Sequence, residues 1–277
     1  MNLTTESTQI NTKHQRNFIL IDGSYFCFQR YHALSKWWKL SDKPPCDEPF
    51  ECEEFVNKFK TTFHTKIKEI KKKLKIKDPT VFVAKDCPRS SIWRHECTND
   101  YKKNRQHNSH IGNFFKMAYD TLFKSAGVTE IFAIDQLEAD DCIAITTKLI
   151  TTQFPDSKIY IIANDTDYLQ LVSSNVFVFN MSFKSIATTK TQNNDSSFDL
   201  FCKIVRGDKS DNIPPVFSKC SVKTALYLFN NPNDLEEKLQ KKNASERMNQ
   251  NRKLVDFNYI PEHLSLEFQN KYCTFLV

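Results

Sequence analysis

The chain has 277 residues and a formal net charge of +6, and its 40% hydrophobic and 13% aromatic residues are typical of a globular protein with an ample core. No apolar run approaches the roughly 20 residues that a membrane span needs. The nine cysteines lack any C-x-x-C spacing and favour reduced thiols over a disulfide framework or a zinc site, so we expect an intracellular protein without a membrane partner.

Short apolar runs alternate with helical patterns along most of the chain. Residues 1–16 are polar and aperiodic, which predicts a mobile leader. Runs of β-branched and aromatic residues predict buried strands at 18–22, 80–84, 130–134, 158–164 and 176–180. Helical patterns separate these runs, notably at 53–77 and 113–125. Because strands alternate with helices, we expect an α/β fold with a mostly parallel central sheet flanked by helices.

The helix predicted for residues 53–77 has two contrasting faces. One face is apolar, and the other carries nine lysines between Lys58 and Lys77. We interpret the lysines as a solvated helix surface, with a DNA-facing surface as the alternative.

The last third of the chain differs from the alternating part. A polar loop at 187–197 precedes it, and residues 232–253 have the pattern of a highly charged helix. We therefore expect a core at 17–197 that is followed by a helical region at 198–277.

Acidic residues lie in five short clusters, each at a point where an apolar run stops. They are Asp22, Asp86, Glu138, Asp140, Asp141, Asp165, Asp167, Asp208 and Asp211. Functional groups gather at the carboxyl ends of strands in an open α/β sheet, so we expect these carboxylates to share one crevice. There they would repel one another unless cations lay between them. For the cluster at Glu138, acidic capping of a helix N-terminus is the alternative.

The donor set favours hard divalent ions. No histidine or cysteine stands at ligand spacing beside the acids, and sites made only of oxygen favour Mg²⁺ or Mn²⁺ over zinc. So many carboxylates suffice for two ions, which together activate water and stabilise the leaving oxygen in phosphodiester hydrolysis. The sequence holds no Walker motif, no G-x-G-x-x-G and no G-x-S-x-G, which argues against a nucleotide-driven motor or a dinucleotide enzyme.

Five motifs in this order resemble the structure-specific 5′-nuclease superfamily, which comprises flap endonucleases, phage 5′-exonucleases and the 5′-nuclease domain of bacterial DNA polymerase I. The motifs are FILIDGS, DYKKNR, LEADDCIA, IIANDTDYLQL and VRGDKSDNIP, and the resemblance runs from Phe18 to about Ala225. It implies a PIN-like nuclease core at 17–197 with an arch at about 86–112. Within 198–277 it implies a helix–three-turn–helix region that grips duplex DNA.

The resemblance also implies roles for charged residues. All nine acids match metal ligands, although Asp141 and Asp208 match acids whose role varies more within the family. Arg94, Lys102 and Arg105 match basic residues of the arch, which hold the scissile phosphate and stabilise charge in the transition state.

The DNA contacts that the resemblance implies lie outside the acidic clusters. Phe28 stands where some relatives place an aromatic side chain against a base, and a core phenylalanine is the alternative. Lys223 and Thr224 open the K-T-A motif that follows the hairpin after GDKSDNIP. Residues 269–276 loosely resemble a sliding-clamp-binding peptide, but we interpret them as a closing amphipathic helix and keep clamp binding as the alternative.

These features together imply a structure-specific 5′ nuclease, a 5′-3′ exonuclease or flap endonuclease active in DNA replication or repair. It would hydrolyse flapped, branched or 5′-ended DNA as a monomer with two Mg²⁺ or Mn²⁺ ions. Two alternatives stay open, namely an RNA-directed nuclease of the same fold and a catalytically weak protein that binds DNA junctions.

Two positions depart from the family pattern. The family carries a glycine-bearing hairpin between GDKSDNIP and K-T-A, whereas residues 215–222 hold no glycine. Glycines there let backbone N–H groups approach a phosphate or a monovalent cation, so we expect weaker or altered duplex binding. Asn164 stands where glycine is common before the paired aspartates, which is a milder change because Asn tolerates unusual backbone angles.

Overall fold

The computed structural model describes residues 16–105, 111–190 and 195–276, so the predicted leader falls almost wholly outside the described residues. A five-stranded sheet has the order β3-β2-β1-β4-β5, and every pair of neighbours is parallel. The strands are β1 (Asn17–Asp22), β2 (Thr80–Ala84), β3 (Glu130–Phe132), β4 (Lys158–Ile162) and β5 (Val176–Phe179). The predicted α/β class and all five strands are confirmed, with β3 and β4 each two residues shorter than expected.

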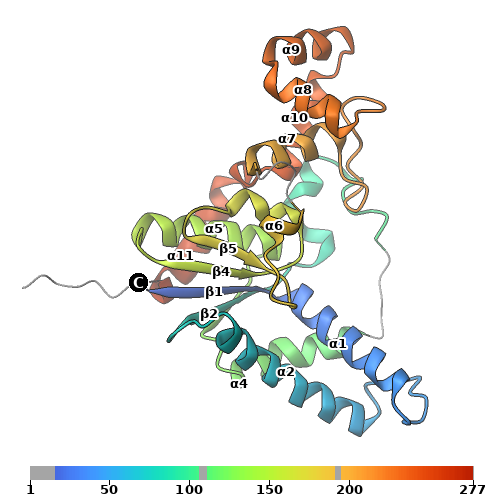
Figure 1. Cartoon of the computed structure of the whole chain (residues 1–277), viewed down its shortest axis with the longest axis vertical. Coiled ribbons are helices and arrows are strands. Elements are labelled where there is room, and N and C mark those ends of the chain that lie inside the picture. The colour runs from blue at the N-terminus through green and yellow to red at the C-terminus, as the bar shows by residue number, and fades with distance from the viewer. Residues whose placement is uncertain (1–15, 106–110, 191–194, 277) are drawn as a thin grey trace, which may run out of the picture.

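The sheet is covered on both faces, which explains why its strands read as continuous apolar runs. Figure 1 shows α1, α2 and α4 on one side of the sheet and α5 and α11 on the other. The first side holds α1 (Gly23–Leu40), α2 (Glu53–Lys73), α3 (Gly112–Met117), a π-helical turn η4 (Ala118–Leu122) and α4 (Phe123–Ser125). The second side holds α5 (Ala139–Gln153) and α11 (Glu262–Leu276). Short 3₁₀ helices are η1 (Arg89–Ser91), η2 (Trp93–Glu96), η5 (Thr166–Leu171) and η6 (Phe257–Tyr259).

Two predicted helices have different boundaries in the structure. The helix expected to reach residue 77 ends at Lys73, because Leu74 caps it and Lys75 adopts a left-handed conformation with φ 53°. The single charged helix expected at 232–253 is two helices, α9 (Pro232–Lys241) and α10 (Ser245–Val255). Asn243, with φ 48°, turns the chain between them. The spacing of apolar and polar residues does not reveal which residues adopt a left-handed conformation. The helical pattern of the sequence therefore runs on through both turns.

Helix α6 (Ile186–Lys190) packs against β5 and η5 and occupies the start of the stretch predicted as a polar loop. The helical region begins with α7 (Ser196–Arg206), and a loop leads from α7 to α8 (Val222–Asn230). Helices α8 and α9 project away from the sheet at the top of Figure 1. Helix α10 packs back against α7. Two helices joined by a long turning loop are the arrangement expected of the predicted helix–three-turn–helix.

Helix α11 returns to the sheet instead of staying with the helical region. Leu264, Phe268 and Tyr272 are buried in the same core cluster as Phe132 of β3. The hydroxyl of Tyr272 accepts the N–H of Ala133 at 2.9 Å. The prediction of a closing amphipathic helix is confirmed. Within the described residues, no helix is long and apolar enough to cross a membrane.

Candidate metal centre

A cleft opens where the strand order reverses, at the carboxyl ends of β1 and β4. A crevice forms at such a point because the connections on either side of the central strand run in opposite directions across the sheet. The cavity measures about 190 Å³. Its wall carries five of the predicted acids and two of the predicted cations: Asp22, Asp86, Glu138, Asp140, Asp165, Lys102 and Arg105.

Asp22 and Asp86 come from the ends of the neighbouring strands β1 and β2. Asp22 caps α1 by accepting a backbone N–H at 2.9 Å, and its other oxygen accepts the hydroxyl of Tyr168 at 2.9 Å. Asp86 accepts the backbone N–H of Ala139 at 2.8 Å and the hydroxyl of Ser24 at 2.5 Å. Donors from other segments therefore hold both carboxylates in place.

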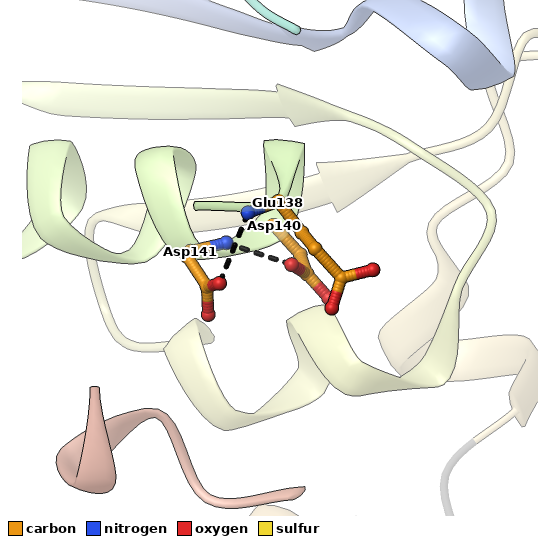
Figure 2. A group of neighbouring side chains, drawn as sticks. All are labelled: Glu138, Asp140 and Asp141. Carbon is orange, nitrogen blue, oxygen red and sulfur yellow. Dashed lines mark hydrogen bonds between the residues drawn. The ribbon is translucent and has the colours of Figure 1, made fainter. Parts of the chain in front are cut away.

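The third cluster lies at the start of α5. Glu138 is the N-cap, and Asp140 and Asp141 stand in the first turn. Figure 2 shows Asp141 turned away from the other two carboxylates. Its Oδ2 accepts the N–H of Glu138 at 3.1 Å, while Asp140 Oδ1 accepts the N–H of Asp141 at 2.8 Å. Both interpretations of this cluster therefore apply, since Asp141 caps the helix while Glu138 and Asp140 line the cleft.

Arg94 does not line the cleft, contrary to the arch role that the sequence implied for it. Its Nη2 and Nη1 donate to the two oxygens of Asp141 at 2.7 and 2.8 Å, and Trp93 Nε1 donates to Asp141 Oδ2 at 3.0 Å. Arg94 also donates to Glu138 at 3.0 Å and to the carbonyl of Leu254 at 2.8 Å. At 2% exposure it is a buried link between η2, α5 and α10.

Lys102 and Arg105 face the cleft from the predicted arch. Lys102 pairs with Glu138 and lies 4.0 Å from Asp211 Oδ2, and Arg105 pairs with Asp211. The hydroxyl of Tyr101 donates to Glu138 at 3.0 Å. Burial opposes the charge of Lys102, but Glu138 and Asp211 raise its pKa above the usual value. Both side chains therefore bring permanent positive charge to the rim.

Asp167 and Asp208 line a neighbouring cavity of about 250 Å³. Asp165 joins the two cavities, because it lines the first and caps η5 by accepting the N–H of Asp167 at 3.1 Å. Lys203 of α7 lies between the acids of the second cavity, paired with Asp167 and 2.8 Å from Asp208 Oδ2. Partial burial opposes ionisation of Asp208, but Lys203 and Ser210 lower its pKa to about 2. Seven of the nine acids therefore line two adjoining cavities instead of the one crevice expected, and Asp141 and Asp211 line neither.

The motifs DYKKNR and GDKSDN dock against each other. The N–H of Lys102 donates to the carbonyl of Asp211 at 2.9 Å, and Asn212 Nδ2 donates to the carbonyl of Asp100 at 2.8 Å. Asp211 lines neither cavity, and its side chain is held by Arg105 in this contact. The sequence presents the motifs as separate features, but the structure makes them one wall of the site.

The predicted DNA contacts lie at different distances from the cleft. Phe28 lines it, is 42% exposed and packs edge-on against Phe115 with ring centroids 4.8 Å apart, so it is not a core phenylalanine. Lys223 and Thr224 lie in the first turn of α8, outside both cavities. Thr224 contributes its N–H to the cap formed by Ser221 at 3.1 Å.

Sequence reasoning missed several side chains that hold the acids. Lys203 is the most consequential, and its signal was a single lysine inside the apolar run LFCKIV. Tyr168 follows Asp167 directly and is fully buried, while Trp93 precedes Arg94. An aromatic residue beside a predicted site residue was the available signal for both.

The carboxylates crowd one another enough to resist ionisation. Burial, together with Asp86, raises the pKa of Asp22 to about 7, and burial raises the pKa of Asp167 to about 7. The pKa of Asp140 also lies well above its usual value, because of burial and the charges of Asp141 and Glu138. A divalent cation would relieve this repulsion, and donors made only of oxygen fit Mg²⁺ or Mn²⁺.

Comparison with known proteins places most of the chain beside one group of nucleases. Residues 17–199 match the family model of the 5′-3′ exonuclease, N-terminal resolvase-like domain. A 5′-3′ exonuclease of Buchnera aphidicola is 31% identical over 227 residues, which cover 79% of this chain and 71% of that protein. Ribonuclease H of Enterobacteria phage T4 is 27% identical over 209 residues, which cover 68% of this chain and 67% of that protein.

Solved structures of phage T5 proteins share the fold. The T5 5′-exonuclease with bound zinc superposes with a TM-score of 0.70 at 22% identity and covers 95% of this chain and 100% of its own. The T5 flap endonuclease, in a pseudo-enzyme–product complex with DNA and metal ions, gives 0.67 at 22% identity and covers 94% and 99%.

Proposed function

The chain belongs to the 5′-3′ exonuclease family, and we propose that its cleft hydrolyses phosphodiester bonds in flapped, branched or 5′-ended DNA with two divalent metal ions. One observation carries this proposal. Five carboxylates converge in one cavity at the switch point of a parallel sheet, and two permanent cations stand on its rim. Buried carboxylates supply ion ligands, and basic side chains on the rim attract a phosphate.

The two cavities suggest where the ions are held. We assign one ion to the carboxylates of the cleft and the other to Asp167 and Asp208, with Asp165 between them. Bound Mg²⁺ or Mn²⁺ would activate water and stabilise the leaving oxygen. Lys203 already places positive charge at the second position, so an ion there has to compete with the lysine.

The chain's own side chains orient the substrate. We propose that Lys102 and Arg105 hold the scissile phosphate and stabilise its developing charge. Phe28, exposed in the cleft wall, offers a face on which a base can stack. Arg94 and Asp141 form a buried positioning pair that holds the start of α5.

The helical region would grip the duplex beyond the cut. Lys223 and Thr224 of α8 are our candidates for contacts with the DNA backbone, and we propose that residues 17–197 cleave while residues 198–277 bind. We propose that the protein acts as a monomer. Clamp binding through residues 269–276 would require Tyr272 to leave the core, so we favour a closing role for α11.

A cleavage assay tests the proposal. Purified protein given a 5′-labelled flap substrate should cut it with Mg²⁺ and should not cut it with EDTA. The double variant Asp165→Ala plus Asp167→Ala should lose cleavage but keep its fold. Its matched control, Asp42→Ala plus Asp47→Ala, removes the same charge from an exposed loop and should cleave normally. Full activity in the first double variant would contradict the assignment of Asp165 and Asp167 as metal ligands. Tight DNA binding in Ca²⁺ without cleavage in Mg²⁺ or Mn²⁺ would favour the junction-binding alternative.

An RNA-directed activity is the second candidate, because the phage T4 relative carries the name ribonuclease H. Matched flap substrates made of DNA, of RNA and of an RNA–DNA hybrid separate the two. A preference for the DNA strand supports our proposal, and a preference for RNA in the hybrid would replace it.

A further inference from the structure

Tyr119 is placed unusually and has no part in the proposed chemistry. It lies in the π-helical turn η4, which interrupts the helix formed by α3 and α4. Its hydroxyl oxygen is buried and has no hydrogen-bond partner within the described residues. Single π turns widen a helix and occur often at functional sites, and a buried hydroxyl without a partner is uncommon. The π turn and the buried hydroxyl, which both cost stability, therefore coincide at Tyr119.

The hydroxyl of Tyr119 lies at the junction of the two strands that carry Asp22 and Asp86. A methyl group added at Gly23 would stand 2.5 Å from this hydroxyl and 2.7 Å from the carbonyl oxygen of Ala84. Gly23 directly follows Asp22, and Ala84 ends β2 two residues before Asp86. The close approach is therefore available only because residue 23 is glycine.

Packing alone does not account for a tyrosine here. A phenylalanine would keep the ring contacts with Phe115 and Phe123 without burying a polar atom. Burial raises the pKa of Tyr119 well above its usual value. The charge of Asp86 raises it further, and an interaction with the Ser24 side chain lowers it. Ser24 Oγ already donates to Asp86 Oδ2 at 2.5 Å, so its lone pairs are free to accept from a second donor.

We propose that Tyr119 is a positioning residue of the metal centre, whose hydroxyl donates to Ser24 Oγ and so fixes the Asp86 carboxylate through a Tyr119–Ser24–Asp86 chain. The inference rests on the proposed function only in taking Asp86 as an ion ligand. Outer partners of this kind orient a ligand and raise affinity for the ion. Helix α3–η4–α4, which begins where the predicted arch ends, thereby takes part in shaping the site.

Calorimetric titration of Mn²⁺ into the DNA-free protein tests this without relying on catalysis. Tyr119→Phe should weaken Mn²⁺ binding by about tenfold, and Ser24→Ala should do the same. Because both act through one path, the double variant should be no weaker than either single variant. The metal-free melting temperature of Tyr119→Phe should change little, since the variant keeps the ring packing and loses one hydrogen bond to Ser24, whose net contribution to stability is small. Tyr160→Phe, a half-buried tyrosine of β4, is the matched control and should bind Mn²⁺ normally.

The outcomes separate this inference from the proposed function. Wild-type Mn²⁺ affinity in Tyr119→Phe would reduce Tyr119 to a packing residue, and an effect that Ser24→Ala does not share would overturn the path through Ser24. A wild-type protein that binds Mn²⁺ but cleaves no nucleic acid would end the proposed function, while the affinities would still decide on Tyr119. A wild-type protein that binds no divalent ion would overturn both.

Discussion

The carboxylate cleft depends on side chains, whereas the loop between α7 and α8 depends on the backbone. In the cleft, separate strand ends each contribute a carboxylate that donors from distant segments hold, as Tyr168 holds Asp22. In the loop, one contiguous segment turns through left-handed residues. Gly207, Asn212 and Lys219 have φ values of 70°, 59° and 59°.

The difference shows where the sequence can depart from the family pattern while the metal site is kept. A side-chain site keeps its chemistry as long as the acids stay where the fold presents them, and all five cleft acids do: Asp22, Asp86 and Asp165 at or just after strand ends, and Glu138 and Asp140 at the start of α5. A backbone site needs particular backbone conformations, and a left-handed conformation costs free energy in any residue other than glycine. This chain keeps glycine at position 207 but has lysine at 219, so the loop should behave less like the family than the cleft does.

Glu138→Gln should have the largest effect, because Glu138 joins the cleft to its buried cations. Lys102 and Arg94 would lose a charged partner, which should lower the free energy of unfolding by about 3–5 kcal/mol. Single-turnover cleavage of a flap substrate should fall by about 100-fold or more, since an ion ligand is lost as well. Urea unfolding measures the first effect. Glu237→Gln, in an exposed pair with Lys241, is the control and should change neither quantity appreciably.

A stable and active Glu138→Gln protein would break the comparison, because it would mean that the cleft does not depend on its side chains.

Gly207→Ala tests the backbone side of the comparison. A Cβ there would stand 2.3 Å from the carbonyl oxygen of Ile213, and residue 207 has φ 70°. We expect the free energy of unfolding to fall by about 1–3 kcal/mol and duplex affinity to weaken, while Mn²⁺ affinity of the cleft stays normal. Gly127→Ala is the matched control, with φ 81° but open space around the added carbon, so it isolates angle strain from collision. Equal losses of stability in Gly207→Ala and Gly127→Ala would mean that the close approach of Gly207 to Ile213 has no effect of its own.

Sequence patterns predicted the elements that rest on local chemistry. Apolar runs identified all five strands, and the acids at their ends marked the cleft, because buried parallel strands leave little ambiguity in either. Contacts that form only on folding stayed hidden. Arg94 looks like any basic arch residue until Asp141 is beside it, and nothing in the run LFCKIV says that Lys203 faces Asp167.

The docking of Asp100–Arg105 onto Gly207–Asn212 was invisible for the same reason, since its bonds join residues about 110 positions apart. The π turn η4 was missed because an extra residue in one turn leaves the apolar pattern nearly unchanged.

The pH dependence of the metal-free protein should sharpen the account of the cleft. Asp22 and Asp167 have pKa values raised to about 7 from 3.8, mainly by burial. Below pH 7 the folded state keeps protons that the unfolded chain has released, so stability should rise as the pH falls from 8 to 5. Asp208, with its pKa lowered to about 2 from 3.8, opposes this only at still lower pH. Melting temperatures should therefore be a few degrees higher at pH 5 than at pH 8.

Saturating Mg²⁺ should abolish this gain, because bound ions favour the ionised carboxylates and stabilise the protein at pH 8. Asp22→Asn should reduce the slope in the metal-free protein. A melting temperature that rises steadily from pH 5 to pH 8 without metal would contradict the raised pKa values.

Lys219→Gly should have the smallest effect and separates the two properties of that residue. Glycine relieves the left-handed strain but adds freedom to the unfolded chain, so the free energy of unfolding should change by no more than about 0.5–1 kcal/mol. Loss of the charge should weaken duplex binding and reduce its salt dependence by about one phosphate contact. Lys219→Asn loses the same charge while tolerating the same angle. If both variants bind DNA alike, Lys219 acts through its charge; if only the glycine variant binds more tightly, the loop is limited by its backbone, as the comparison with the cleft holds.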